Sequence, residues 1–193
     1  GADVIDGRGG FDTADYSVSD GPVVINLATG SGSGADATGD TLVSVEHIIG
    51  SGFDDHMIGS SGDDSFDGDF GNDLLEGGEG SDRYVLGFDS KDDTVTELGL
   101  ATDTDHVVLR AGIAPKDVSL VRQGESLLIE LEKDDGFLFD TMLVTNHFVS
   151  RETGIEEIVF ANGTVWDRDD IEAMSRLGRF NAEDDLYRIG VED

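Results

Sequence analysis

The chain of 193 residues contains no cysteine, two prolines and one tryptophan. The absence of cysteine excludes disulfide bonds and thiolate metal sites. Basic side chains are also scarce: 12 Lys and Arg stand against 43 Asp and Glu, which gives a formal net charge of −31. Such an acidic chain is poorly suited to bind nucleic acid or an anionic membrane. No apolar run approaches the ~20 residues of a membrane helix, so we expect no transmembrane segment.

Glycine and aspartate are abundant, and between Gly50 and Val85 they follow a nine-residue period. The four copies read GSGFDDHMI, GSSGDDSFD, GDFGNDLLE and GGEGSDRYV. Each copy has glycine at position one, aspartate at position six and a large apolar residue at position eight, namely Met57, Phe66, Leu75 and Tyr84. A fixed period predicts a solenoid whose repeats stack on one another. The alternative, a glycine-rich flexible linker, does not explain the regular large hydrophobe.

The repeat composition indicates a calcium site at each turn. Glycine permits positive φ and brings backbone carbonyls close together, and these carbonyls plus one aspartate are hard oxygen ligands. Residues 1–100 carry 22 acidic and 3 basic side chains, so this half of the chain repels itself unless cations neutralise it. We therefore expect disorder without calcium and folding coupled to binding, at the ~10⁻⁴ to 10⁻³ M calcium typical of extracellular modules.

The repeats resemble the RTX repeats of bacterial proteins exported by type I secretion. The resemblance implies a secreted chain and a right-handed parallel β-roll, in which several calcium ions lie between the turns of repeats n and n+2. The implied ligands of the first two sites are Ser51, Phe53, Asp55, Gly68, Phe70 and Asp73, and then Ser60, Gly62, Asp64, Gly77, Glu79 and Asp82. A third site would join Gly32, Gly34 and Asp36 to Gly50, Gly52 and Asp55, and a fourth would join Arg8, Gly10 and Asp12 to the loop ending at Asp36.

Earlier repeats are visible at the start of the chain, where Asp3 and Asp12 are again nine residues apart. Residues 16–47 break the period and read as an insertion. Steps of about two repeats lead from Asp12 through Asp36 and Asp55 to Asp73. We therefore expect one continuous roll over residues 1–90 rather than two separate repeat blocks.

After residue 90 the period stops, and residues 92–178 read as strands followed by a short helix. Strands are expected near 107–109, 118–122, 127–132, 142–149 and 155–160, and a helix over 167–177 with Asp167 as its N-cap. The segments GIAPKDVSLVR (112–122), LLIE (127–130) and IEEIVFANGTVWDRDDI (155–171) resemble the haemolysin-type calcium-binding-related domain. This resemblance implies an all-β protein whose roll ends in a β-rich cap with one C-terminal helix. Residues 179–193 read as a tail that resembles the start of another repeat.

Catalytic motifs are not visible in the sequence. It has no G-x-S-x-G elbow, HExxH motif or phosphate loop, and its four histidines read as structural, with His147 on an exposed strand face. Trp166, Phe137 and Phe139 could line a sugar-binding face, although Trp166 reads better as a core residue. We expect no enzyme activity, and a role as a calcium-folded module that stabilises or spaces flanking domains of a larger polypeptide. The alternatives are a carbohydrate-binding or adhesive module that contacts glycan or a cell surface, and an accessory region of a secreted epimerase, lipase or protease.

Overall fold

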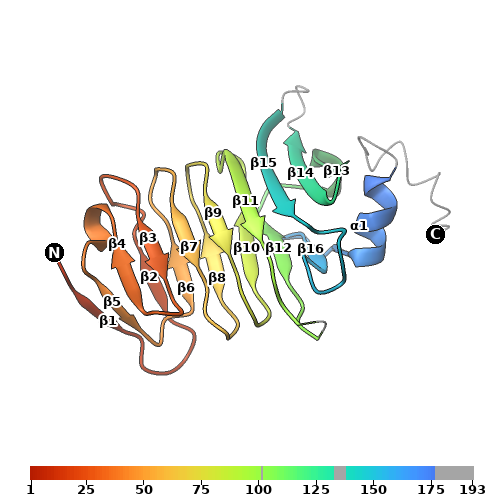
Figure 1. Cartoon of the computed structure of the whole chain (residues 1–193). Coiled ribbons are helices and arrows are strands. Elements are labelled where there is room, and N and C mark those ends of the chain that lie inside the picture. The colour runs from red at the N-terminus through yellow and green to blue at the C-terminus, as the bar shows by residue number, and fades with distance from the viewer. Residues whose placement is uncertain (101, 133–137, 177–193) are drawn as a thin grey trace.

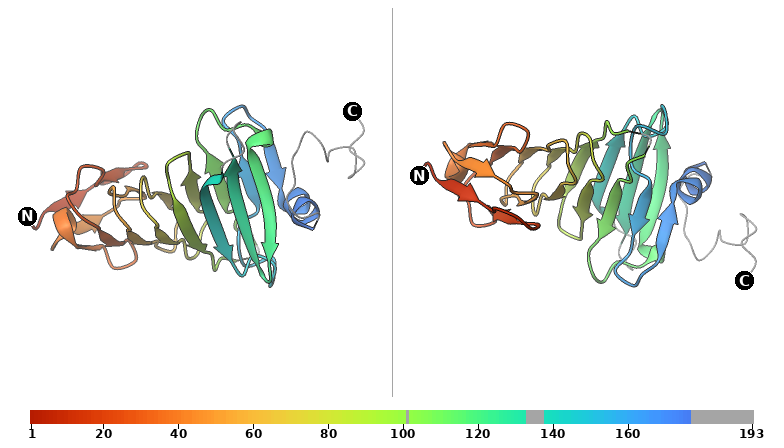
Figure 2. Two further views of the ribbon diagram at one scale, coloured as in Figure 1. Left: turned by 90° about the horizontal axis from the view of Figure 1, so that it is seen from above. Right: turned by 90° about the horizontal axis from the view of Figure 1, so that it is seen from below.

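The structure is a computed structural model that describes residues 1–100, 102–132 and 138–176. The molecule is elongated, with the N-terminus at one end and helix α1 (Arg168–Ser175) at the other (Figure 1). Its strands form two facing rows (Figure 2). One sheet has ten strands in the order β1 (Val4–Asp6), β5 (Thr41–Val43), β4 (Ser31–Ser33), β3 (Val24–Asn26), β7 (His56–Ile58), β9 (Leu74–Glu76), β11 (Asp92–Thr96), β15 (Leu138–Thr145), β14 (Ser126–Glu132) and β13 (Val118–Gln123). The other has seven, in the order β17 (Val165–Asp167), β16 (Glu157–Val159), β12 (His106–Leu109), β10 (Arg83–Leu86), β8 (Ser65–Asp67), β6 (His47–Ile49) and β2 (Thr13–Asp15).

The strands of the repeats alternate between the two sheets. β6, β8 and β10 pair in parallel in one sheet, while β7 and β9 pair in parallel in the other. Equivalent residues of neighbouring coils, such as Asp55 and Asp73, are 18 residues apart. One coil therefore comprises two repeats, as the nine-residue period predicts.

A single column of side chains fills the space between the sheets. Met57, Phe66, Leu75 and Tyr84 are fully buried, which confirms the inward direction of position eight. The rings of Phe66 and Tyr84 stack with centroids 5.9 Å apart. Burying one such side chain contributes about 1.5–3 kcal/mol, and only a stack of coils provides the cover.

The N-terminal region continues the same two sheets, as expected. β2 pairs in parallel with β6, and β3 pairs in parallel with β7. The expected insertion contains β4, the short 3₁₀ helix η1 (Ala35–Ala37) and β5. β4 runs antiparallel to both β3 and β5, whereas β5 pairs in parallel with β1 and leads into the turn before β6. The segment of β4 and η1 therefore leaves the coil and does not form a coil turn, and the coil resumes at β5.

The sheets also continue across residue 90 into the C-terminal region. β11 pairs in parallel with β15, and β12 pairs in parallel with β16. The antiparallel strands β13 and β14, with the 3₁₀ helix η2 (Pro115–Asp117) before them, then complete one sheet, and β17 completes the other. The predicted helix is present, with its N-cap at Asp167 and with Ile171 and Met174 buried. Residues 177–193, which include the expected tail, lie outside the described residues, as do Phe137 and the side chain of Phe139.

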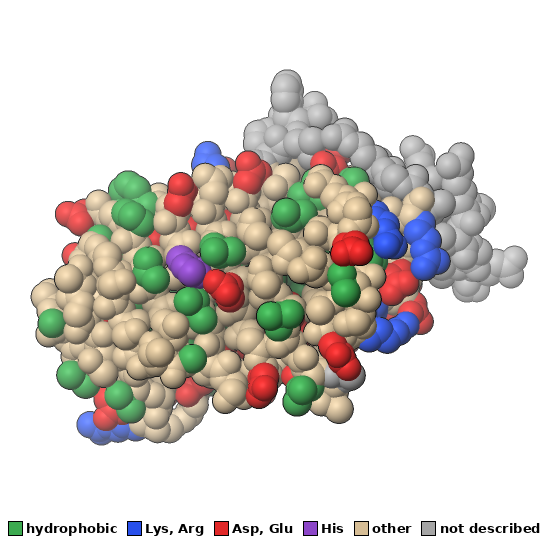
Figure 3. All heavy atoms as spheres, viewed as in Figure 1, with side chains coloured by type: hydrophobic (Ala, Val, Ile, Leu, Met, Phe, Trp, Pro, Cys, Tyr) green, Lys and Arg blue, Asp and Glu red, His purple; other side chains and the backbone are tan. Residues whose placement is uncertain are grey.

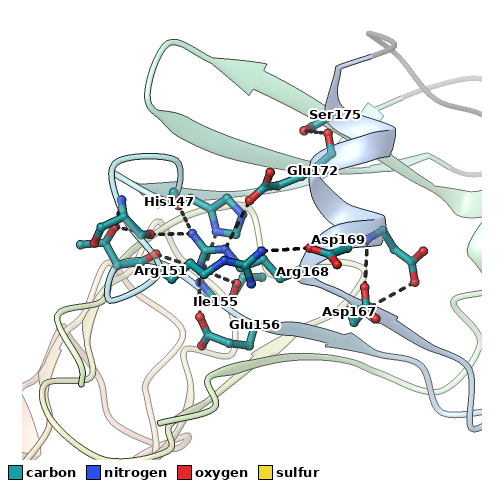
Figure 4. Close-up of polar contacts among 12 residues, drawn as sticks. His147, Arg151, Ile155, Glu156, Asp167, Arg168, Asp169, Glu172 and Ser175 are labelled. Atoms are coloured by element: carbon teal, nitrogen blue, oxygen red, sulfur yellow. Dashed lines mark hydrogen bonds and ion pairs between the residues drawn. The ribbon is translucent and has the colours of Figure 1, made fainter. Parts of the chain in front are cut away.

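Arg168 ties α1 to the loop that precedes β16 (Figure 4). It is 5% exposed, and its guanidinium donates to Glu156 at 2.9 Å, to the carbonyls of Ser150 and Thr153 at 2.8 and 3.0 Å, and to the carbonyl of His147. His147 is fully buried, so its predicted position on an exposed strand face is wrong. The reason is that the loop folds under α1, where His147 Nδ1 accepts a hydrogen bond from the Ile155 N–H at 3.3 Å. Burial and the charge of Arg168 lower the pKa of His147 to about 3, which keeps the ring neutral.

Candidate calcium sites in the turns

Acidic side chains stack in two columns at the turns between strands. In each column a carboxylate accepts a hydrogen bond from the backbone N–H of the preceding coil. One column contains Asp55, Asp73, Asp93 and Asp140, at 2.7, 2.8, 3.1 and 2.7 Å from the N–H groups of Val23, Asp55, Asp73 and Lys91. The other contains Glu46, Asp82, Asp105 and Glu156, at 3.0, 2.8, 2.8 and 2.9 Å from the N–H groups of Asp12, Asp64, Asp82 and Asp105. Asp64 belongs to the second column, because Ser65 N–H donates to the Glu46 carbonyl at 2.7 Å.

The structure brings together the two turns of the first expected site. A Cβ added to Gly50 would lie 2.5 Å from Asp55 Oδ2 and 2.7 Å from the Gly68 carbonyl oxygen, so these two oxygens converge on one small space. A Cβ added to Gly71 would lie 2.4 Å from the Phe53 carbonyl oxygen. Glycine is required at both positions because the turns approach so closely.

The second expected site has the same arrangement. A Cβ added to Gly59 would lie 2.0 Å from the Gly77 carbonyl oxygen and 3.0 Å from Asp64 Oδ2. A Cβ added to Gly78 would lie 2.7 Å from the Ser60 carbonyl oxygen, and one added to Gly80 would lie 2.6 Å from that of Gly62. The turns 59–64 and 77–82 therefore face each other, with Glu79 exposed at the rim.

The third expected site is not assembled. Asp36 is exposed in η1, on the part of the chain that leaves the coil, and its backbone N–H donates to Ser19 Oγ at 3.3 Å. The segment that stacks on Asp55 is the one preceding β3, since Val23 N–H is its hydrogen-bond donor. Gly34 packs against Pro22 and Gly32 against Ala37, so neither lies in the turn of Gly50 and Gly52.

The fourth expected site has a different partner from the predicted one. Asp12 N–H donates to Glu46 Oε2 at 3.0 Å, and a Cβ added to Gly7 would lie 2.1 Å from the Ser44 carbonyl oxygen. The turn of Arg8, Gly10 and Asp12 therefore stacks on the segment before β6 and not on the loop ending at Asp36. The step from Asp12 to Asp36 is wrong because the insertion falls between two coils and not within a turn.

Burial makes these carboxylates hard to ionise. It raises the pKa of Asp82 and of Asp105 to about 7, and the neighbouring carboxylates add to the rise. Burial also raises the pKa of Asp73 and of Asp93. The negative charge of Asp93 raises the pKa of Asp73 further, and that of Asp140 raises the pKa of Asp93. A bound cation offsets both effects, because it stabilises the charged form of every carboxylate around it.

The donor set fits calcium. Buried carboxylate oxygens without a hydrogen-bond partner among the described residues are Asp12 Oδ2, Asp73 Oδ2, Asp82 Oδ2 and Asp93 Oδ2. A buried unpaired acceptor is costly, and native proteins leave few of them. Calcium takes 6–8 oxygen ligands from carboxylates and backbone carbonyls, which are the groups that converge in these turns.

Several members of the columns lie outside the expected sites, namely Glu46, Asp93, Asp105, Asp140 and Glu156. The coils that lead to Asp93 and Asp105 are longer than the 18 residues of the repeats, since the step from Asp73 to Asp93 is 20 residues and that from Asp82 to Asp105 is 23. One signal remains in the sequence: Asp93, the second residue of β11, and Asp105, which directly precedes β12, each stand two residues before a buried valine, Val95 or Val107. The phrase Asp-x-apolar-x thus persists after the glycines of the turns are lost.

Protein-family comparison agrees with this geometry. Residues 49–84 match the RTX calcium-binding nonapeptide repeat in four copies. These residues are RTX repeats. Residues 132–170 match the haemolysin-type calcium binding protein related domain, within the region expected to form the cap. No curated protein matches the chain.

The RTX match indicates two general properties, calcium binding and secretion. RTX repeats bind calcium, and proteins that contain them are typically secreted. The described residues are mostly strands with one short α-helix, as expected for an all-β protein. None of their helices combines the length and apolar character needed to cross a bilayer.

Proposed function

We propose that this chain is a calcium-folded RTX module of a larger bacterial protein exported by type I secretion. Residues 1–90 form a parallel β-roll, and residues 92–178 form its cap. The module stabilises or spaces the domains attached to it. The observation that carries this proposal is the set of buried carboxylate oxygens without a partner, Asp73 Oδ2 and Asp82 Oδ2 above all.

Calcium acts as a folding switch in this proposal. Without the ion, the buried carboxylates of the two columns must ionise next to one another or be protonated, and both oppose folding near neutral pH. With the ion, binding free energy becomes folding free energy. Millimolar calcium outside the cell would therefore fold a chain that stays loose inside it.

The C-terminal region serves as an end cap. A bare solenoid end would expose strand edges and apolar surface. Here α1 contacts β13, β16 and β17 and covers that end with Ile171 and Met174. Basic side chains gather mainly at this end, whereas acidic side chains are spread along the face shown (Figure 3).

The carbohydrate-binding alternative loses its strongest residue. Trp166 is 8% exposed, and its ring packs edge-on against Phe160 with centroids 4.7 Å apart. This supports the core role of Trp166 and leaves no platform for a sugar ring at that residue. We also propose that the chain of 193 residues has no catalytic function. Turnover of ester, peptide or polyuronate substrates by the isolated chain would contradict this.

A calcium titration followed by far-UV circular dichroism tests the proposed function. The expected result is a cooperative gain of β signal at submillimolar to millimolar calcium and no equivalent gain with magnesium. Asp73→Ala should shift the midpoint to higher calcium, whereas Asp20→Ala, at an exposed aspartate, should leave it unchanged. A chain already fully folded in chelator would refute the switch.

A further inference from the structure

A third carboxylate enters the turn after the last repeat. Atoms of Asp82, Glu97 and Asp105 lie within 4.8 Å of one another, and the three residues are 0%, 1% and 3% exposed. Asp82 belongs to the fourth repeat, whereas Glu97 and Asp105 lie beyond the residues that match the RTX repeat. Among the described residues, these three form a group of acidic side chains close enough together to hold a metal ion without backbone ligands.

The strand register explains how Glu97 reaches this place. Thr96 pairs with Glu76 between β11 and β9, so Glu97 follows its strand where Gly77 follows the strand of the coil before. A Cβ added to Gly77 would lie 2.3 Å from Glu97 Oε2 and 2.4 Å from Asp82 Oδ2. The two oxygens therefore meet in the space left by the missing side chain of Gly77. In the preceding coil, the equivalent space beside Gly59 is reached by the backbone carbonyl of Gly77.

An unsatisfied atom points to a ligand. Asp82 is fully buried, and its Oδ1 accepts from Asp64 N–H at 2.8 Å while its Oδ2 has no partner. None of the ion pairs among the described residues involves Asp82, Glu97 or Asp105. Three buried carboxylates without a basic partner repel one another unless a cation joins them.

We propose that Asp82, Glu97 and Asp105 bind a further calcium ion, held by three side-chain carboxylates at the junction of the repeats and the cap. The proposal rests on the proposed function, because it requires a chain that folds with calcium. The hydroxyl of Tyr84 donates a hydrogen bond to Glu97 Oε2, so the Tyr84 ring lies beside the site and can report on an ion bound there. Tyr84 differs from its equivalents in the other repeats, Met57, Phe66 and Leu75, because it carries a hydroxyl group that can donate a hydrogen bond.

The test counts the ions and locates one of them. Calcium bound per chain is measured by equilibrium dialysis for the unmodified chain, for Glu97→Gln and for Glu125→Gln, an exposed control with the same change of charge between β13 and β14. Terbium, which replaces calcium and emits when a nearby tyrosine is excited, is bound in parallel by the same proteins and by Tyr84→Phe. Circular dichroism at saturating calcium checks the fold of each variant.

The expected result is one ion fewer in Glu97→Gln, an unchanged number in Glu125→Gln, and loss of most tyrosine-excited terbium emission in Glu97→Gln. Tyr84→Phe should lose the same emission while it keeps the full number of ions. This variant therefore tests the site independently, even if Glu97→Gln does not fold. Equal ion numbers in all variants, or full emission from Tyr84→Phe, would overturn the junction site and leave the repeat sites standing. An unmodified chain that binds no calcium would instead overturn the proposed function.

Discussion

Replacing Asp82 by asparagine should change stability in opposite directions with and without calcium. Asparagine is similar in shape and neutral, and its side-chain oxygen can still accept the hydrogen bond from Asp64 N–H. The change therefore removes the charge of a fully buried carboxylate and little else. Without calcium that charge opposes folding, whereas with calcium it is a ligand.

The magnitude follows from the pKa of Asp82, which burial raises from 3.8 to about 7 in the folded chain. Between these pH values the folded chain holds a proton that the unfolded chain has released. The free energy of unfolding without calcium therefore falls as pH rises from about 4 to 7, by an upper limit of about 4 kcal/mol for this group. Asparagine does not titrate, so the variant should be more stable than the unmodified chain at pH 8 in chelator.

With calcium the sign reverses. An ion present at about 100 times its dissociation constant stabilises the folded chain by about 2.7 kcal/mol, and most of this should be lost when a carboxylate ligand is removed. In calcium the assay is urea unfolding followed by circular dichroism at pH 5 and pH 8. In chelator, where the unmodified chain is expected to be unfolded near neutral pH, the assay is the gain of β signal at the same pH values as a stabilising osmolyte is added. Asp20→Asn is the control, since a change at an exposed aspartate should stay within about 0.5 kcal/mol. Equal destabilisation of Asp82→Asn in calcium and in chelator would refute the reasoning.

Three further predictions concern packing. Gly59→Ala should lower the free energy of unfolding in calcium by about 1–3 kcal/mol, because the added Cβ meets the Gly77 carbonyl. Gly52→Ala, whose Cβ would have no atom within 4 Å, should be neutral, and chemical denaturation measures the unfolding free energy of both variants. Phe66→Ala should lower the same quantity by about 3–5 kcal/mol, because the ring is fully buried between coils. Arg168→Met should lower it by about 3–5 kcal/mol and speed hydrogen exchange in 146–156, whereas Arg151→Met, which breaks an exposed ion pair, should cost less than about 1 kcal/mol. Unchanged exchange in Arg168→Met would contradict the anchoring role.

The sequence was sufficient to predict the parts of the fold that repeat. The glycine and aspartate period predicts the coil of two repeats, and the apolar eighth position predicts the buried column of Met57, Phe66 and Leu75. Both follow from local chemistry, because each repeat buries its apolar eighth residue between the sheets in the same way. The helix after Asp167 was predictable for the same reason, since its capping residue and first turn are local signals.

The stacking of the first coils was not predictable from spacing alone. An insertion shifts the count, and only strand pairing decides whether Asp36 or the segment at Val23 lies against Asp55. Glu97 was missed for a related reason. Its role depends on the register between β9 and β11, which places it beside Gly77, and no local motif marks that position.

The columns of carboxylates also indicate why calcium matters more in the repeats than in the cap. At the last acid of each column, which lies in the cap, both oxygens are satisfied by the protein. Asp140 accepts from the N–H groups of Asp89 and Lys91 at 2.9 and 2.7 Å, and Glu156 accepts from Asp105 N–H and from Arg168, each at 2.9 Å. In the repeats an oxygen of Asp73 and of Asp82 stays unpaired, whereas Oδ2 of Asp55 and of Asp64 accepts from the N–H of Ser51 or Ser60 in the same turn. The same carboxylate-to-backbone contact therefore runs the length of the molecule, and within the repeats Asp73 and Asp82 each keep one oxygen for a metal ion.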